Sequence, residues 1–531
     1  MKFNLIEEKW IRVIKKDGNI AEYGIKDTFA DMQNILSFGG EHRLQDTAML
    51  RLFVALSVTM IYRYQTDGTR KEASNERELR ERFATIYKKG EFPQRVLDSY
   101  FDEWHNRFYL IDEQYPFYQV PERSIRKEIK DPGKKSEEIL YQLPDISGQY
   151  KTMNHKDASA INGLVLESGN KPSVYTDVNG TEKVSLSFAE AARWLVWYMN
   201  YADRGAKASG KGKWESQMTF TSSGTVMYGI GQNLFETVLQ NSVLLKNGVM
   251  YEKVSPAWER TASLIVQDEP YGEAAPQNLP ELYTQQSRRI ILQEKEGRIT
   301  DVYIIAGDKY SAVNAFIEPM FLWKADPKDK SGMTKTTLKY NTKSKWRNLQ
   351  ATLKHSDTCG VIQWIRELED EEVLDEEQNI PFVLTGITYG TMQSVVDEML
   401  FDEVIVNPSF FNDDEKADQM REMIDKINNV STEMYKFGCR LQESEGSTSD
   451  SSKIKGEQIQ TSFQNKAEVL FRKFMLGKMA KDKIYEDLKR ISFSIIEEQF
   501  NSLGIWAFHS ERLNIADAEV KVKKEIYKLL G

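Results

Sequence analysis

The sequence predicts an α+β fold, with a large mixed α/β domain over residues 1–390 and a C-terminal four-helix bundle over residues 391–531. The chain has 531 residues, of which 40% are apolar. This length and composition suit about two to four domains with sizeable cores. Up to about residue 390, β-type runs alternate with helical periods. Beyond it, four long charged amphipathic stretches joined by loops favour an antiparallel bundle.

The N-terminal region begins with a predicted β-hairpin over residues 10–25, in which Asp17 and Gly18 supply the turn. Three helices are expected next, over residues 46–65, 77–87 and 93–106. Residues 50–62 are the most apolar part of the chain, but they contain Arg51 and are shorter than the ~20 residues that a membrane helix needs. A buried core helix is therefore predicted there.

The middle of the chain contains one irregular stretch and several clear elements. Residues 150–181 show no periodicity, and a long irregular loop in a compact domain is usually functional or disordered. Ser187 and Glu190 fit a capping box, so a helix begins there and should end before Gly205. Strands are expected over residues 290–293, 300–305 and 381–389.

The four C-terminal helices are expected over residues 414–442, 458–479, 482–502 and 516–530. A Ser/Gly-rich stretch over residues 443–452 separates the first two and is expected to form an exposed loop.

Charge and cysteine content exclude several classes of protein. The chain has 71 Lys and Arg against 80 Asp and Glu, a net charge of -9. This balance disfavours a protein that coats nucleic acid with its whole surface, yet it permits a local basic patch. Cys359 and Cys439 are too few for a disulfide framework or a zinc ribbon. Free buried thiols, a cytoplasmic location and no signal peptide are expected.

No arrangement of residues specifies a reaction. The five histidines are scattered, and neither an H-E-x-x-H metal motif nor a G-x-S-x-G nucleophile elbow occurs. We therefore expect no catalytic residues, no enzyme activity, no cofactor and no metal.

The segment Arg204–Lys213 combines four basic residues with three glycines and has no acid. Glycine lets a backbone approach a ligand closely and lysine attracts phosphate, although a surface turn explains the same pattern. Gly205, Gly210 and Lys211 nearly match the phosphate-binding loop of nucleotide-dependent enzymes. However, Gly212 replaces the Ser or Thr that binds Mg²⁺, and the preceding element is a predicted helix where that motif requires a strand.

Two further polar segments are candidates for a site. Arg288 and Arg289 lead into a predicted strand. In one interpretation, the two arginines together bind a phosphate or carboxylate. In the other, they lie on opposite faces of the strand and one of them forms a salt bridge. The pattern leaves both interpretations open. Gly386 and Gly390 flank a polar turn within residues 385–394. Such a turn lets side chains project from a rigid scaffold, but an ordinary connection has the same pattern.

Five blocks of this sequence resemble the CasA family, the large subunit of the type I-E CRISPR Cascade complex. They run nearly the full length of the chain, over residues 3–13, 108–119, 186–195, 282–290 and 317–320. The resemblance implies a subunit that recognises the protospacer-adjacent motif of foreign double-stranded DNA from the minor groove. It also implies duplex opening, R-loop formation with the guide CRISPR RNA, and recruitment of a helicase–nuclease. The implied partners are the other Cascade subunits, the guide RNA and the target DNA, with no membrane.

The resemblance assigns the minor-groove contact to a glycine-rich loop that matches Gly205–Gly212 and includes Lys207, Gly210 and Lys211. A lysine that also reads the motif matches Lys309. This loop contains more lysine than a pure glycine loop would. The lysines imply that several related motifs are tolerated, because phosphate contacts carry little sequence information.

Two other roles follow from the same resemblance. A glutamine wedge that splits the duplex falls within Thr391, Met392 and Gln393, with Gln393 as the first choice and Met392 as the alternative. Residues 151–160, with Asn154, resemble a loop that seats the subunit beside the 5′ end of the guide and the target. The C-terminal bundle is expected to help hold the displaced strand.

The chain departs from the family pattern in one respect, and two other functions fit its sequence. Some members of the family carry a cysteine-based zinc site, for which this chain lacks the cysteines. The first rival is a nucleotide-binding enzyme built on the loop Gly205–Gly212. The second is a scaffold subunit that holds the complex together without reading DNA.

Overall fold

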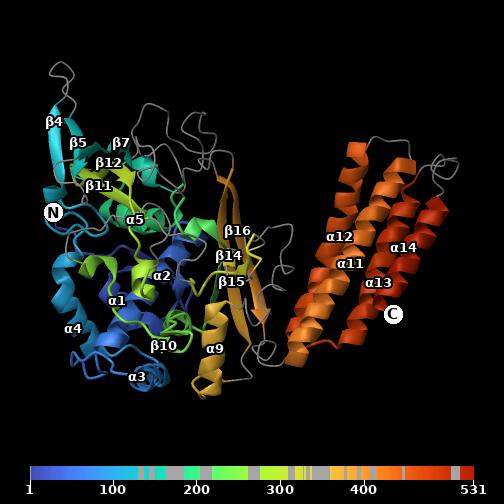
Figure 1. Ribbon diagram of the computed structural model, residues 1–531, viewed down its shortest axis with the longest axis horizontal. Helices are drawn as coiled ribbons and strands as arrows, with labels where there is room; N and C mark the ends of the chain where they lie inside the picture. Colours follow the sequence, from blue (N-terminus) through green and yellow to red (C-terminus); the bar gives the residue numbers. More distant parts are fainter. Residues whose placement is uncertain are drawn as a thin grey trace. The chain divides into compact units, whose positions relative to one another are not determined.

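The computed structural model describes residues 2–129, 137–142, 150–162, 185–203, 218–260, 276–308, 317–326, 328–330, 335–337, 359–375, 379–390, 396–406, 414–444, 449–503 and 515–531. The chain divides into two compact units. The first comprises Met1–Thr342, Asp357–Val373 and Val383–Asp402, and the second comprises Lys343–Ser356, Leu374–Phe382 and Glu403–Gly531. Helices and strands are mixed in the first unit, and four long helices dominate the second (Figure 1). This confirms the predicted α+β fold class.

The predicted N-terminal hairpin is present. Strands β1 (Ile11–Lys15) and β2 (Ile20–Tyr23) are antiparallel, and β3 (Ile35–Phe38) joins the other side of β1. Gly18 forms the turn with φ at +83°, a left-handed backbone conformation that favours glycine.

Helix α2 (Arg43–Arg63) is the centre of the first unit. It packs against α5 (Phe188–Tyr201), α6 (Leu234–Gln240) and α7 (Leu279–Tyr283). Among the described helices, α2 is long and apolar enough to span a membrane, and 94% of its most apolar window is buried within the protein. A helix that is apolar on all sides needs such complete coverage, so the predicted core helix is confirmed.

The other helices in the described part of the first unit lie around this centre (Figure 1). The α-helices are α1 (Ile25–Asp31), α3 (Glu76–Lys89), α4 (Gln94–Trp104) and α9 (Gly360–Asp370). Short 3₁₀ turns are η1 (Met32–Asn34), η2 (His105–Arg107), η3 (Glu122–Ser124), η4 (Ala158–Ile161), η6 (Thr221–Ser223) and η7 (Ala257–Glu259).

Three further three-stranded sheets contain most of the remaining strands. The first has the strand order β11 (Arg288–Lys295), β12 (Arg298–Ala306), β7 (Asn154–Asp157). The second has the order β4 (Ile125–Ile129), β5 (Glu137–Gln142), β6 (Tyr150–Thr152). The third has the order β16 (Val396–Val406), β15 (Ile380–Tyr389), β8 (Val226–Gly229). Two short pairs are β9 (Leu245–Lys246) with β10 (Val249–Met250), and β13 (Trp323–Ala325) with β14 (Lys335–Thr337). The strands predicted over residues 290–293, 300–305 and 381–389 are confirmed.

The prediction of an irregular stretch over residues 150–181 is wrong for its first part. Residues 150–161 form β6, β7 and η4. Strand β7 is short, and it is stabilised by pairing with β12, which is far from it in the sequence. Such an edge strand has no period of its own in the sequence. Residues 163–181 lie outside the described residues.

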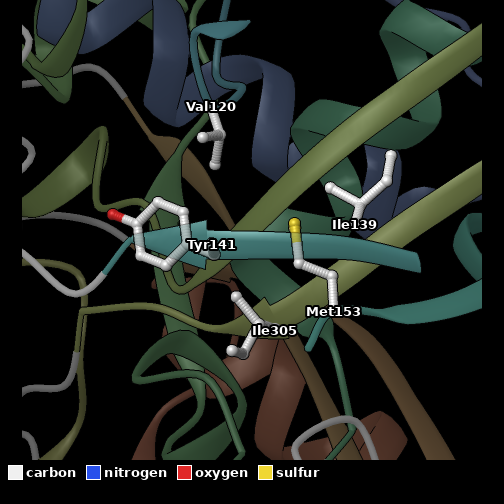
Figure 2. Close-up of a cluster of buried hydrophobic side chains, with 5 residues drawn as sticks. All are labelled: Val120, Ile139, Tyr141, Met153 and Ile305. Atoms are coloured by element: carbon white, nitrogen blue, oxygen red, sulfur yellow. The ribbon is translucent and has the colours of Figure 1, made fainter. Parts of the chain in front are cut away.

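A buried apolar cluster joins the β4–β5–β6 sheet to the β11–β12–β7 sheet (Figure 2). Its members are Val120, Ile139, Tyr141, Met153 and Ile305, each at most 3% exposed. Ile139 and Tyr141 lie two residues apart on β5 and therefore share one face of the strand. The cluster fixes the position of Tyr141 relative to β12.

The second unit is a four-helix bundle. Helix α11 (Asp414–Ser444) packs on α12 (Ser449–Met475) and α14 (Ile515–Leu530), and α13 (Lys481–Asn501) also packs on α12 and α14. Gly438 and Gly456 let α11 and α12 approach closely, since a Cβ on Gly438 would lie 2.7 Å from the Gly456 Cα. The four predicted helices are confirmed.

The largest difference from the predicted helix boundaries is at the start of α12. Helix α12 begins at Ser449, within the stretch that the sequence predicts as an exposed loop. Serine and aspartate are common at helix starts, so the Ser/Asp run from residue 449 also suits the first turn of a helix.

Candidate functional site

The candidate DNA-contacting residues fall in three segments that lie outside the described residues. Gly205, Lys207, Gly210, Lys211 and Gly212 belong to residues 204–217, Lys309 belongs to residues 309–316, and Thr391, Met392 and Gln393 belong to residues 391–395. The described residues at the ends of these segments show where each segment is anchored.

The glycine-rich segment follows the C-terminal end of α5 in the sequence. This helix begins with the predicted capping box, in which the Glu190 amide donates to the Ser187 hydroxyl and the Glu190 carboxylate accepts from the Ser187 amide. The chain returns at Thr219, whose amide donates to the Ala202 carbonyl at 3.3 Å. The Thr219 hydroxyl also donates to the Asn200 carbonyl. Both ends of the segment are therefore held at one place.

Two other elements bind the same helix end. The Tyr389 hydroxyl, at the end of β15, donates to the Tyr201 carbonyl. The Arg288 guanidinium, at the start of β11, donates to the Asp203 carbonyl at 2.6 Å. Carbonyls in the last turn of a helix have no partner within the helix, so they accept such bonds readily. Tyr389 lies two residues before Thr391, so the described residue that precedes the wedge candidates is bonded to the end of α5.

The third segment begins at Asp308, immediately before Lys309. Its carboxylate accepts from Arg289 at 2.7 Å, and its amide donates to the Gln286 carbonyl at 2.9 Å. The Gln285 side chain donates to the Asp308 carbonyl at 2.9 Å. Gly307 is required here, because a Cβ would lie 2.6 Å from the Arg288 amide nitrogen and closer still to the Gln286 oxygen. The residue that precedes Lys309 is thus fixed from three sides.

The far end of the third segment is fixed by a buried ion pair. Glu318 accepts from Arg51 of α2 at 3.0 Å and from the Tyr283 hydroxyl at 2.6 Å. The Arg51 and Glu318 side chains are 1% and 0% exposed. The Arg51 guanidinium also donates to Asn200 at 3.2 Å and lies over the Tyr283 ring at 3.9 Å. Asp308 and Glu318, on the two sides of residues 309–316, are therefore each bonded to a buried arginine.

Two of the anchoring residues, Arg289 and Tyr389, keep one protonation state over the ordinary pH range. Burial by itself would lower the pKa of Arg289, but Asp308 and Tyr141 outweigh it and hold the pKa above its usual value. Burial raises the pKa of the Tyr389 hydroxyl, so this phenol stays protonated and can donate its hydrogen bond.

The structure distinguishes the two interpretations of Arg288 and Arg289. The two side chains leave β11 on opposite faces, as consecutive strand residues do. Arg289 forms a salt bridge with Asp308, and Arg288 binds backbone carbonyls. The pair therefore fits the second interpretation, two faces of one strand with one arginine in a salt bridge.

Sequence reasoning missed four residues that anchor these segments: Arg51, Asp308, Glu318 and Tyr389. Only Arg51 carried a usable signal, because a charged residue inside an apolar helix implies a buried partner. The partner itself, Glu318, lies 267 residues away and no local pattern identifies it.

The element before the glycine-rich segment is helix α5, as the sequence predicts. A nucleotide-binding P-loop instead follows a strand, whose end aims the loop at the phosphates. The structure therefore confirms the predicted departure from that motif, which stands beside the Gly212 substitution.

Asn154 lies in a different part of the first unit. It is half-buried on β7 and pairs with Ile304 of β12. The adjacent His155 is hydrogen-bonded to Asp301 at 2.9 Å and stacks on Tyr303 at 4.8 Å. Asn154 is therefore held by a regular sheet, and its expected role beside the guide RNA stays a prediction.

Cys359 supports the Glu318 anchor. Its thiol donates to the Pro319 carbonyl at 2.8 Å, and burial raises its pKa to about 12. The expectation of buried thiols is confirmed for Cys359, whereas Cys439 is only partly buried. Within the described residues, no group of three or more His, Cys, Asp or Glu side chains could hold a metal.

In a Cys439→Ser variant, we expect Cys359 to resist thiol reagents at about pH 8 in the folded chain, because the thiolate is the reactive form. Labelling kinetics with a chromogenic disulfide measures this directly, and the same variant in denaturant provides the fully reactive control. Equal labelling rates in the two conditions would contradict the buried anchor.

Comparison with known proteins gives a consistent set of similarities. Residues 4–493 match the family described as CRISPR-associated protein Cse1. The CRISPR-associated protein CasA/Cse1 of Thermus thermophilus is 25% identical over 259 residues. That match covers 49% of this chain and 42% of the relative, so the chain aligns with less than half of the relative's length.

Solved structures share the fold along the whole chain. Thermobifida fusca Cse1 has a TM-score of 0.76 at 20% identity, covering 100% of this chain and 98% of that chain. Cse1 from Acidimicrobium ferrooxidans has a TM-score of 0.75 at 18% identity, with the same coverage. A chain of a CRISPR RNA-guided surveillance complex has a TM-score of 0.68 at 13% identity, covering 99% of each chain.

Proposed function

Because this chain belongs to the CRISPR-associated Cse1 (CasA) family, we propose that it is the large subunit of a type I-E CRISPR Cascade complex. In this role it recognises the motif that flanks the target in double-stranded DNA. It promotes opening of the duplex so that the guide RNA can pair with one strand. It has no catalytic activity of its own, and a recruited helicase–nuclease cuts the DNA.

One observation supports this proposal above the others: the anchors of two segments bond to the end of α5, and the anchor of the third bonds to the next residue of the same strand, β11. Tyr389 and Arg288 both bind carbonyls there, and Arg289 next to Arg288 holds Asp308. The segments that start at these anchors carry the glycine-rich sequence, Lys309 and the Gln393 wedge. A DNA reader needs such groups close together, because the motif is short.

The chemistry of these segments suits the minor groove. Glycines allow close backbone approach, and lysines supply phosphate or base-edge contacts. The minor groove presents a degenerate pattern of acceptors, so such a reader tolerates several related motifs. A wedge side chain offsets part of the unstacking cost, which is about a few kcal/mol per base step. Sequence specificity beyond the motif then comes from pairing with the guide RNA.

The same proposal assigns the partners. A similar chain forms part of a solved CRISPR RNA-guided surveillance complex. We infer that this chain likewise binds other Cascade subunits and the guide CRISPR RNA. Asn154 on β7 would contact the guide or target, and the bundle α11–α14 would help hold the displaced strand.

The test uses the reconstituted complex with and without this chain. The target is fixed, the flanking positions are randomised, and the bound duplexes are sequenced. We expect a few flanking positions to be enriched when the chain is present, and no enrichment when it is absent. A target that already carries an unpaired bubble should bind equally well with any flank, because no duplex has to be opened.

Other results would favour the rivals. If the complex assembles only with this chain but the bound duplexes show no enrichment at the flanking positions, the chain is a scaffold subunit. Flanking enrichment that persists without the chain would place motif reading in another subunit. Saturable binding of ATP by the chain would support the nucleotide-dependent enzyme.

A further inference from the structure

A cavity of about 750 Å³ lies in the first unit, between residues 106–120 and the strands β4 and β11. Sites that bind small molecules commonly measure about 300–1,000 Å³. Exposed residues such as Asn106 and Gln114 contribute to the lining, so a ligand can enter from solvent. None of the residues that the proposed function uses is among the described residues that line this cavity.

One part of the cavity wall is apolar and preformed. Val120, Ile125 and Leu292 contribute to it, and Val120 also belongs to the buried cluster that joins two sheets (Figure 2). Gln119 connects the strands behind this wall. Its side-chain carbonyl accepts from the Leu292 amide at 2.8 Å, and its side-chain NH₂ donates to the Leu110 carbonyl. The wall therefore needs no ligand to hold its shape.

Two tyrosines, Tyr109 and Tyr115, also line the cavity, and each has at least one cation over its ring. Lys2 lies over the Tyr109 ring at 5.3 Å. Arg107 and Arg123 lie over the Tyr115 ring at 3.5 and 5.6 Å. Aromatic rings and guanidinium planes are the flat groups on which proteins stack unpaired nucleobases. The cavity is therefore bordered by groups that suit a flat, aromatic ligand.

Positive charge exceeds negative charge around the cavity. Four cations and two carboxylates border it: Lys2, Lys127, Arg107, Arg123, Asp112 and Glu113. Asp112 accepts from the amides of Gln114 and Tyr115 at 2.9 and 2.8 Å, so part of its charge is already used within the turn. Among the residues that the structure describes, none forms an ion pair with Lys2, Arg107 or Arg123. Exposed cations without an acidic partner attract an anion such as phosphate.

Three amide side chains complete the lining: Asn106, Gln114 and Gln293. A side-chain amide offers both a hydrogen-bond donor and an acceptor. The edge of a nucleobase presents the same two kinds of group. Within the described part of the chain, these three side chains have no hydrogen-bond partner, so they are available to a ligand.

We propose, independently of the proposed function, that this cavity binds a nucleotide with an unpaired base. The base lies among the tyrosines, the amides and the apolar wall, and the phosphate lies on the cations. An inorganic anion would not need the apolar and aromatic lining, and an apolar ligand would not need the cations. A free mononucleotide and one unpaired residue of a nucleic-acid strand share this chemistry, so the experiment distinguishes these two sources.

The first measurement titrates the full chain with adenosine monophosphate (AMP), adenosine and ribose 5-phosphate by calorimetry. Adenosine lacks the phosphate and ribose 5-phosphate lacks the base. Each should bind at least about tenfold less tightly than AMP, because base stacking and charge-assisted hydrogen bonds each contribute about 1–3 kcal/mol. Ribose 5-phosphate that binds as tightly as AMP would indicate a simple anion site and overturn the proposal.

A larger side chain inside the cavity tests whether the nucleotide binds there. Gln293 is half-buried on β11 and lines the cavity, so Gln293→Trp fills the space that the base would occupy. This variant should lower the affinity for AMP by at least about tenfold, the loss of one stacked base. Lys295→Trp is the matched control, because Lys295 is exposed on the same strand and is not among the described lining residues. Gln114→Trp, at an exposed lining position, replaces Gln293→Trp if that variant does not fold.

The cations are tested with a single-stranded RNA or DNA hexamer. Arg107→Gln with Arg123→Gln removes two cations at the cavity. Arg77→Gln with Arg95→Gln removes two exposed arginines elsewhere in the first unit and is the charge-matched control. On a single strand each phosphate contact contributes about 0.7 to the slope of log affinity against log salt, so the first pair should make the slope shallower by about 1.4 and the control should not.

The outcomes identify the source of the nucleotide or overturn the proposal. A hexamer that displaces AMP and shows the shallower slope indicates a strand as the ligand, and the tighter of RNA and DNA identifies which strand. AMP that binds without being displaced by either hexamer indicates a free nucleotide. If Gln293→Trp binds AMP and both hexamers as tightly as Lys295→Trp does, or if none of the three probes binds, the cavity is not a nucleotide site. The proposed function would still stand, because it rests on enrichment at the flanking positions of a duplex.

Discussion

Replacement of Arg51 by alanine is expected to lower the free energy of unfolding of the first unit by about 3–5 kcal/mol, the usual cost of removing one partner from a buried ion pair. Glu318 would lose its cationic partner in a site where both side chains are almost completely buried. The Tyr283 hydroxyl, which donates to Glu318 at 2.6 Å, cannot replace a cation. Urea denaturation followed by circular dichroism measures the change.

An exposed ion pair of the same unit provides the control for this measurement. Arg77 contacts Glu81 at 2.8 Å, with side chains 88% and 62% exposed. Arg77→Ala should therefore change the free energy of unfolding by less than about 1 kcal/mol. In Arg51→Met combined with Glu318→Gln, the buried charge is gone and much of the loss should be recovered. A cost for Arg51→Ala as small as that for Arg77→Ala would contradict the buried anchor.

The combined substitution of Lys309 and Gln393 by alanine is expected to lower the affinity of the complex for a motif-bearing duplex by at least about tenfold. One base contact contributes about 1–3 kcal/mol of discrimination, and an inserted wedge offsets unstacking that costs about a few kcal/mol per step. Binding to a bubble target should be unchanged. Titration of labelled duplex and bubble targets into the reconstituted complex measures both affinities.

Lys16→Ala with Gln232→Ala is the matched control, because both residues are exposed and lie outside the three segments. This variant should bind both targets as the wild type does. Substitution of Met392 tests the alternative wedge: if Gln393→Ala is silent and Met392→Ala is not, Met392 is the wedge. Unchanged duplex binding by the Lys309 and Gln393 variant in an assembled complex would support a scaffold subunit.

Local patterns in the sequence are sufficient to predict most of the fold. The apolar run of α2, the capping box of α5 and the amphipathic periods of α11–α14 all identify helices that the structure contains. These signals are local, because a helix satisfies its own backbone hydrogen bonds. Strands β6 and β7 were missed because short strands depend on partners elsewhere in the chain.

The site could be predicted only in part, for the same reason. The resemblance identifies the segments around Gly205, Lys309 and Gln393, but not the residues that anchor their described ends. Tyr389 bonds to a carbonyl 188 residues away, and Arg51 bonds to Glu318 across 267 residues. Pairings at such separations are properties of the folded chain, and a single sequence does not reveal them.

Site-directed photocrosslinking tests most directly whether this chain reads the motif. A duplex with a photoreactive base at one enriched flanking position is bound by the wild-type complex, irradiated and digested, and the crosslinked peptide is identified. We expect crosslinks to this chain within residues 204–217, 309–316 or 391–395. Crosslinks that fall only on another subunit, or only on the bundle α11–α14, would contradict the proposal that these segments recognise the motif.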